Sequence, residues 1–107
     1  MKTALSILIL ASALIAQTAR DTSEFTVFKR SEPIKVVPEV GLVLKGTDVN
    51  KQRYAVDIVL EGHKIEKKDL DIMVPFYFYV GAKTQPYELL VTKVAADQIV
   101  GRLFSPK

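Results

Sequence analysis

Apolar and polar residues alternate along several short stretches of the chain, and the clearest stretch runs from Arg53 to Glu61. Its large apolar side chains fall on one face, which carries Tyr54, Val56, Ile58 and Leu60. The other face carries Ala55, Asp57, Val59 and Glu61. A period of two residues is typical of a β-strand with one buried face, so this stretch is predicted to be a strand.

A second stretch, Ile72 to Val80, carries four aromatic residues in succession. Alternation places Ile72, Val74, Phe76, Phe78 and Val80 on one face and Met73, Tyr77 and Tyr79 on the other. Phe and Tyr favour a pleated, packed surface, so residues 76–80 are predicted to form a central strand. Pro75 lacks an amide hydrogen and fits the first position of such a strand.

Further strands are predicted wherever an apolar stretch lies between turn-forming residues. They are Phe25–Lys29, Ile34–Val37, Val40–Val49, Tyr87–Val94 and Gln98–Phe104, with a three-residue hairpin turn at Asn50–Gln52. Arg20–Glu24 is polar and is expected to be a loose tail. Six of the eight residues in Lys64–Asp71 are charged, so this segment is interpreted as a solvated connection. A short strand at Lys64–Glu66, or a single helical turn, is an alternative for part of it.

These elements define the fold class. The chain has thirteen Val but only four Ala from residue 20 onward, which favours strands over helices. Six to seven short strands about ten residues apart predict an all-β domain, either a small antiparallel barrel or a sandwich. The last three strands carry apolar residues on both faces and are expected to lie deepest, or to curl so that each face meets another layer.

The first nineteen residues have the order of a secretory signal peptide. Lys2 is followed by an apolar run, Ala4–Ala16, and then by small residues with cleavage sites between Ala16 and Ala19. The run is short for a membrane span, although an uncleaved membrane anchor is the alternative. We therefore expect a cleaved N-terminal signal helix at residues 1–19, a single domain at residues 20–107, and a periplasmic or secreted protein without a stable membrane span.

Charge and cysteine content narrow the partners. From residue 20 onward there are 14 basic and 12 acidic residues with interspersed signs, so no basic surface for nucleic acid is predicted. The absence of cysteine excludes disulfides and thiol chemistry within the chain. The domain must therefore be held together by packing alone, and no cofactor is predicted.

The sequence offers few groups for catalysis. The single histidine, His63, lies in a predicted turn, and no serine has the surroundings of a catalytic nucleophile. Glu61, His63 and Glu66 are the one candidate metal cluster, but such a group arises easily by chance in a charged turn. Asp57 and Glu88 interrupt apolar strands, yet alternation places both toward solvent. We therefore predict a protein that is not an enzyme and has no metal site.

The candidate binding residues are aromatic. Tyr77 and Tyr79 lie on the face opposite Phe76 and Phe78, and Tyr87 could extend their surface. The favoured interpretation of the pattern is that these tyrosines cap a second small core with their hydroxyls at the rim, and an exposed aromatic platform is the alternative. The predicted function is an exported, non-catalytic binding or accessory module that contacts another exported protein or a cell-envelope component. A secreted enzyme inhibitor acting through Lys64–Asp71 or Ala82–Pro86 is the alternative, and a small metal-binding protein is a weaker one.

Overall fold

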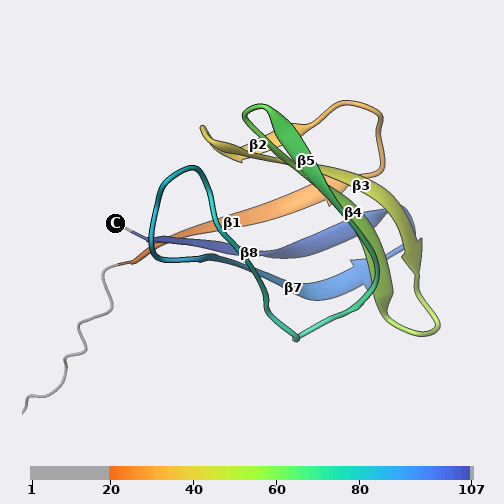
Figure 1. The fold of residues 1–107 in the computed structure, drawn as a ribbon. Helices are drawn as coiled ribbons and strands as arrows, with labels where there is room; N and C mark the ends of the chain where they lie inside the picture. The colour runs from red at the N-terminus through yellow and green to blue at the C-terminus, as the bar shows by residue number, and fades with distance from the viewer. Residues whose placement is uncertain (1–19, 107) are drawn as a thin grey trace, which may run out of the picture.

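The computed structural model describes residues 20–106, which form eight β-strands and no helix (Figure 1). The strands are β1 (Arg20–Phe28), β2 (Ile34–Val37), β3 (Val40–Asp48), β4 (Arg53–Leu60), β5 (His63–Asp71), β6 (Phe76–Phe78), β7 (Tyr87–Ala95) and β8 (Gln98–Pro106). They build two antiparallel four-stranded sheets, ordered β1-β8-β7-β6 and β2-β3-β4-β5. The all-β prediction is confirmed, with eight strands in place of six to seven. The predicted signal peptide lies outside the described residues.

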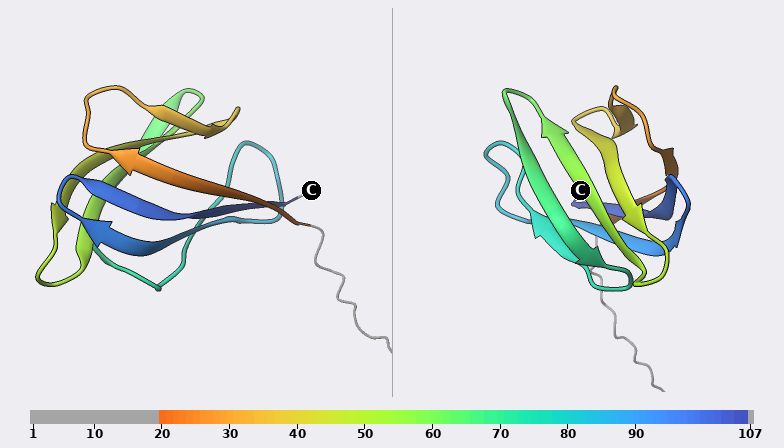
Figure 2. Two further views of the ribbon diagram at one scale, coloured as in Figure 1. Left: turned by 180° about the vertical axis from the view of Figure 1, so that it is seen from behind. Right: turned by 90° about the vertical axis from the view of Figure 1, so that its right-hand side faces the viewer.

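The two sheets face each other across a single apolar core (Figure 2). One half of the core comes from the first sheet, through Phe25, Val27, Phe78, Tyr87, Leu89, Val91, Val94, Ile99 and Leu103. The other half comes from the second sheet, through Val40, Leu42, Leu44, Tyr54, Val56, Ile58 and Leu60. Burying one side chain of this size contributes about 1.5–3 kcal/mol, so this core supplies the main cohesion of a domain without disulfides.

The cleanest sequence pattern is confirmed for its apolar face. In β4, Tyr54, Val56, Ile58 and Leu60 are buried in the core. The prediction that Asp57 on the other face is turned toward solvent is wrong, because this carboxylate is only 7% exposed. The preceding turn contains four residues, 49–52, rather than the predicted three, and Gln52 adopts a positive φ of 54° within it. A β-bulge between Leu44 and Gly46 shifts the register of β3 against β4 by one residue, so that Leu44 lies opposite Val56 and Thr47 lies opposite Tyr54.

The predicted loose tail, Arg20–Glu24, is wrong, because these residues form the first half of β1. The strand pairs with β8 along its whole length, from Arg20 opposite Pro106 to Phe28 opposite Gln98. Backbone hydrogen bonds to β8 order this polar segment although its side chains contribute little to the core. The start of β1 and the end of β8 therefore lie side by side (Figure 1).

The predicted solvated connection, Lys64–Asp71, is also wrong, because it belongs to the edge strand β5. Charged side chains are compatible with a strand that has a neighbour on one side only, and they discourage pairing with other chains. A β-bulge near Lys68 and Asp69, where Asp69 has a φ of 54°, bends β5 against β4. Its apolar Ile65 and Leu70 still lie opposite core residues of β4.

The aromatic strand is shorter than predicted and is not central. β6 contains only Phe76–Phe78 and is the last strand of its sheet. Pro75 ends regular pairing on one side, and Gly81, with a positive φ of 60°, turns the chain on the other. The predicted alternation within β6 is confirmed, because Phe78 is buried and Tyr77 is exposed.

Candidate functional site

Two of the three predicted binding residues are at the surface. Tyr77 is 54% exposed and Tyr79 is 59% exposed. Tyr87 is 0% exposed and packs in the core beside Phe78, with ring centroids 5.6 Å apart. Tyr87 therefore does not extend the exposed aromatic surface, because it begins β7 with its side chain on the core face.

The register of the first sheet identifies the residues that share a face with Tyr77. Tyr77 lies opposite Glu88, Glu88 opposite Phe104, and Phe104 opposite Thr22. Directly paired residues of adjacent strands project to the same side of a sheet, so these four form one row on the outer face. The next row on this face pairs the half-buried Leu90 with the exposed Arg102, and the half-buried Val100 lies one row further along β8. We call Tyr77, Leu90, Val100 and Phe104, with the exposed Tyr79, the tyrosine face.

Arg20 organises the row on which Tyr77 lies. Its Nη2 donates to Oε1 of Glu88 at 3.0 Å, and its guanidinium lies 5.1 Å from the centroid of the Phe104 ring. A charge-assisted hydrogen bond and a cation–π contact thus hold three side chains from three adjacent strands together. The Glu88 carboxylate is largely covered, so its charge is compensated within the face.

The segment leading into β6 extends the exposed apolar surface. Met73 and Val74 are both exposed, and together with Tyr77 and Tyr79 they make up four of the six large exposed hydrophobic side chains of the described chain. The Met73 backbone has a φ of 63°, and its N–H donates to the carbonyl oxygen of Val91 at 2.8 Å. This hydrogen bond fixes the segment against β7. Clustered exposed apolar side chains of this kind mark interaction surfaces.

A polar cluster closes the loop that follows β6. The Tyr87 hydroxyl donates to Oε2 of Glu39 at 2.5 Å and accepts from Nζ of Lys83 at 2.8 Å. The hydrogen bond from Tyr87 lowers the pKa of Glu39. Burial, followed by the Glu39 hydrogen bond, raises the pKa of Tyr87. Three charged or polar groups therefore tie residues 82–86 to the turn between β2 and β3.

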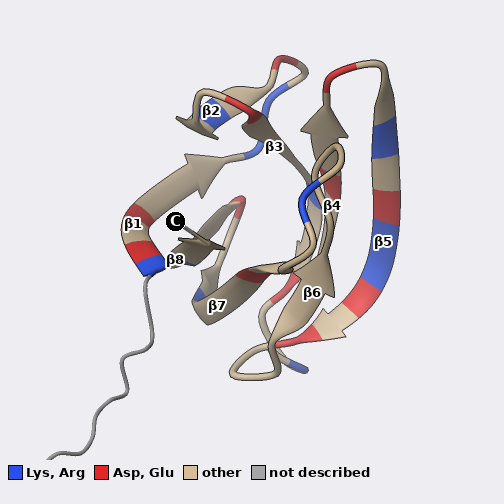
Figure 3. Cartoon of the chain, turned by 60° about the vertical axis from the view of Figure 1, so that its left-hand side comes forward, with Lys and Arg blue, Asp and Glu red and all other residues tan. Residues whose placement is uncertain are grey.

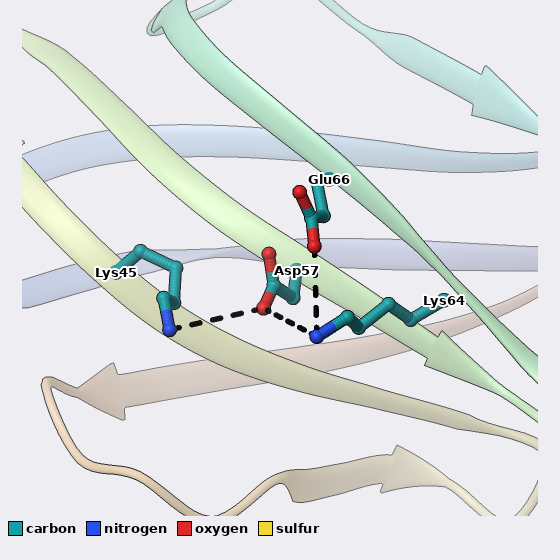
Figure 4. A network of polar contacts seen from close by, with 4 residues as sticks. All are labelled: Lys45, Asp57, Lys64 and Glu66. Atoms are coloured by element: carbon teal, nitrogen blue, oxygen red, sulfur yellow. Dashed lines mark ion pairs between the residues drawn. The ribbon is translucent and has the colours of Figure 1, made fainter.

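Asp57 is the buried carboxylate of the second sheet and lies on its outer face, 7% exposed. Its Oδ2 lies 4.0 Å from Nζ of Lys45 and 3.9 Å from Nζ of Lys64, which also approaches Glu66 at 3.5 Å (Figure 4). Glu88 is on the outer face of the opposite sheet, so the core separates these two carboxylates. They do not face each other across a cleft.

The candidate metal cluster is not assembled. Within residues 20–106, no three or more His, Cys, Asp or Glu side chains are placed to hold a metal ion. His63 and Glu61 instead line a pocket of about 670 Å³ between the turns at one end of the sheets, with Val59, Leu60 and Val80. No helix able to cross a bilayer occurs in the described part of the chain.

Sequence reasoning missed Arg20 and Phe104 as members of the site. The polar composition of Arg20–Glu24 predicts a tail, although Thr22, Glu24 and Thr26 alternate with Ser23, Phe25 and Val27 in the period of a strand. Phe104 was placed on the correct strand, but no local pattern identifies the strand next to it. Strand order is what brings Phe104 and Tyr77 onto one face.

Comparison of the chain with protein-family models, curated proteins and solved structures found no match in any of the three.

Proposed function

We propose that the protein is an exported, non-catalytic binding module that contacts another exported protein or a cell-envelope component through the tyrosine face. The observation that carries this proposal is that Tyr77 and Tyr79 of the tyrosine face are exposed, and that Met73 and Val74, just before them in the chain, are exposed as well. Tyr side chains are enriched where proteins bind each other, because the ring buries a large area and the hydroxyl keeps a polar partner.

The contacts around this face support a binding surface that is already ordered before a partner binds. Arg20, Glu88 and Phe104 hold one another in place, and the Met73 backbone is hydrogen-bonded to β7. Side chains that are already ordered lose less entropy when a partner binds. Export rests on residues 1–19, whose composition is that of a signal peptide. A periplasmic or extracellular location would bring the face into contact with envelope proteins.

The proposal is tested by affinity capture from the native envelope, comparing the wild-type protein with Tyr77→Ala and Tyr79→Ala. Phe28→Ala is a matched control, because Phe28 is 57% exposed on the same sheet but lies at the far edge strand. We expect both tyrosine variants to keep the thermal stability of the wild type and to lose the partner, whereas the control keeps it. A partner retained equally by all four proteins would rule out the tyrosine face.

One observation favours enzyme inhibition as a second candidate function. Ala82–Gln85 are exposed and stand away from the sheets, and Lys83 anchors the loop through Tyr87. A protruding loop held by fixed contacts suits insertion into an enzyme cleft. The test is a panel of exported hydrolases assayed with the wild type and Thr84→Arg. Inhibition that Thr84→Arg abolishes would favour this function over the first.

A further inference from the structure

The four edge strands of the two sheets are protected to different degrees. β5 carries charges of both signs along its length and contains a bulge (Figure 3). It also directs Lys67 inward, where Nζ lies 5.0 Å from the centroid of the Phe76 ring. β2 is only four residues long and has a proline on each side, and β1 carries Arg20, Asp21 and Glu24. Charges, prolines, bulges and short length are the features that keep edge strands from pairing with other chains.

β6 is also short, with three residues, and follows Pro75, but it lacks the charges that the other three edges carry. Residues 72–82 include no Asp, Glu, Lys or Arg, and this is the longest uncharged run within residues 20–106. The strand pairs with β7 on one side only. Alternate residues of such a strand direct their N–H and C=O groups away from the sheet. Its edge is therefore free to accept another strand without placing a charge in the junction.

The sequence of this edge is close to symmetric about Tyr77. Val74 and Val80 are equidistant from it, as are Phe76 and Phe78, and the one mismatch sets Pro75 against Tyr79. In a two-fold antiparallel pair centred on Tyr77, each of these residues would meet its counterpart in a second copy. An interface with two-fold symmetry requires this kind of self-complementarity.

We propose that a second copy of this chain pairs with the β6 edge, with the two-fold axis passing through Tyr77. Two four-stranded sheets then become one eight-stranded sheet that runs across both molecules. Pro75 offers no N–H to this junction, which limits it to a few hydrogen bonds and favours a weak, concentration-dependent dimer. Tyr77 would lie beside Tyr77 of the second copy on the outer face, so the two tyrosine faces would join into one larger surface.

The dimer would also be bivalent toward any partner of the tyrosine face, because each copy contributes one such face. This inference does not depend on the proposed function. A monomer that still loses its partner in Tyr77→Ala would overturn the dimer and leave the binding function intact. A chain that dimerises but captures no envelope partner would support the dimer and overturn the binding function.

The first test is analytical ultracentrifugation of the purified chain, from low micromolar to about 1 mM, the range of weak complexes. The chain is expressed in full, and its intact mass establishes where the purified protein begins. We expect a reversible monomer–dimer equilibrium. Tyr77→Lys should weaken it about tenfold, because an aromatic pair is lost and two like charges are placed opposite each other. Phe28→Lys, with matched exposure, should leave it unchanged.

The second test uses the absence of cysteine from the chain. Directly opposed residues of an antiparallel pair have Cα atoms about 4.5–5.5 Å apart, which suits a disulfide. Tyr77→Cys should therefore form an intermolecular disulfide under mild oxidation, and Phe28→Cys should not. A wild type that stays monomeric over the whole range, or equal cross-linking of the two cysteine variants, would overturn the proposal.

Discussion

Glu88 and Asp57 occupy corresponding places, each on the outer face of its own sheet, but their surroundings differ. Glu88 accepts a 3.0 Å hydrogen bond from Arg20, which also lies over Phe104. Asp57 has two lysine ammonium groups near it, at 3.9 and 4.0 Å. Ion pairs at such distances with exposed lysines contribute little to stability. Glu88 is thus held by a directed contact, and Asp57 by diffuse attraction, although the second sheet has a directed contact elsewhere, from Nε of Arg53 to Oδ1 of Asp71 at 3.0 Å.

The two buried tyrosines of the core also differ in the hydrogen-bond partners of their hydroxyl groups. The Tyr87 hydroxyl, in the first sheet, has both Glu39 and Lys83 as partners. The Tyr54 hydroxyl, in the second sheet, is buried without a hydrogen-bond partner. The hydrogen bonds of Tyr87 also join the two sheets, because Glu39 lies in the turn between β2 and β3.

The largest expected difference between the two sheets is in the free energy of unfolding when alanine replaces a glycine in each of them. A Cβ at Gly101 would lie 2.3 Å from the carbonyl oxygen of Leu90 and 2.9 Å from Cα of Val91. Both are backbone atoms, so Gly101→Ala should lower the free energy of unfolding by about 3 kcal/mol. At Gly46, in the second sheet, nothing lies within 4 Å of the added atom. Gly46→Ala should be neutral or slightly stabilising.

Chemical denaturation of both glycine variants measures this difference directly. The wild type provides the reference, and near-identical m-values would show that the unfolded states are comparable. Equal losses of unfolding free energy in the two variants would contradict this prediction. The close packing of β7, β8 and Phe25 around Gly101 would then not make this site less tolerant of a side chain than Gly46.

The contrast between the sheets also explains which predictions from the sequence succeeded. The large apolar residues of β4 follow the two-residue period, so its buried face is evident from the sequence. The edge strand β2 is predicted with its bounds because prolines flank it. β1 and β5 are misjudged because polar and charged residues mask their period, and β6 because nothing in the aromatic run marks where its pairing ends. The ordering of Arg20–Glu24 comes from β8, some eighty positions further along the chain.

The same limit applies to the site. Local alternation is enough to place Tyr77 and Tyr79 on the face opposite Phe76 and Phe78, but it favours a second small core there, whereas both side chains are exposed. It could not show that Tyr87 turns inward, because this depends on which side of the sheet the core lies at the start of β7. It also could not join Phe104 to Tyr77, since that neighbourhood exists only once β6, β7 and β8 are paired in order.

The second prediction compares the two buried tyrosines. Tyr87→Phe removes a hydroxyl with two charged partners and should lower the free energy of unfolding by about 1 kcal/mol. Tyr54→Phe removes a hydroxyl that is buried without a partner, and should raise it by up to about 1 kcal/mol. Burial, together with the nearby charge of Asp71, raises the pKa of Tyr54 to about 12. Thermal melts should shift in opposite directions, and a shared direction would contradict the contrast.

The third prediction concerns the two outer carboxylates. Glu88→Ala leaves Arg20 without its partner and loosens its contact with Phe104, so it should cost about 1 kcal/mol of unfolding free energy. Asp57→Val replaces a covered carboxylate by a strand-favouring apolar side chain beside Val43, while both lysines stay solvated. It should be neutral or slightly stabilising. The pair is compared by urea denaturation at neutral pH, where a large loss in Asp57→Val would show that its ion pairs matter.

The smallest expected effect is the pH dependence of the Glu39 contact. The hydrogen bond from Tyr87, assisted by the charge of Lys83, holds the pKa of Glu39 below its ordinary value of 4.5. A carboxyl whose pKa is lower in the folded state adds stability above the unfolded pKa, and loses it as the pH falls through the folded pKa. The free energy of unfolding should therefore decline as the pH falls below about 4.5, with a modest amplitude because Glu39 is partly exposed.

Glu39→Gln still accepts a hydrogen bond from Tyr87 but cannot ionise, so this part of the acid decline should disappear. Tyr87→Phe should flatten the same part of the profile, because the donor is gone. Combining the two changes should flatten it no further, since both act on one contact. If the loss of unfolding free energy at acid pH persists in Glu39→Gln, its origin lies in other carboxylates. The contact between Glu39 and Tyr87 would then contribute as little to stability as the ion pairs around Asp57.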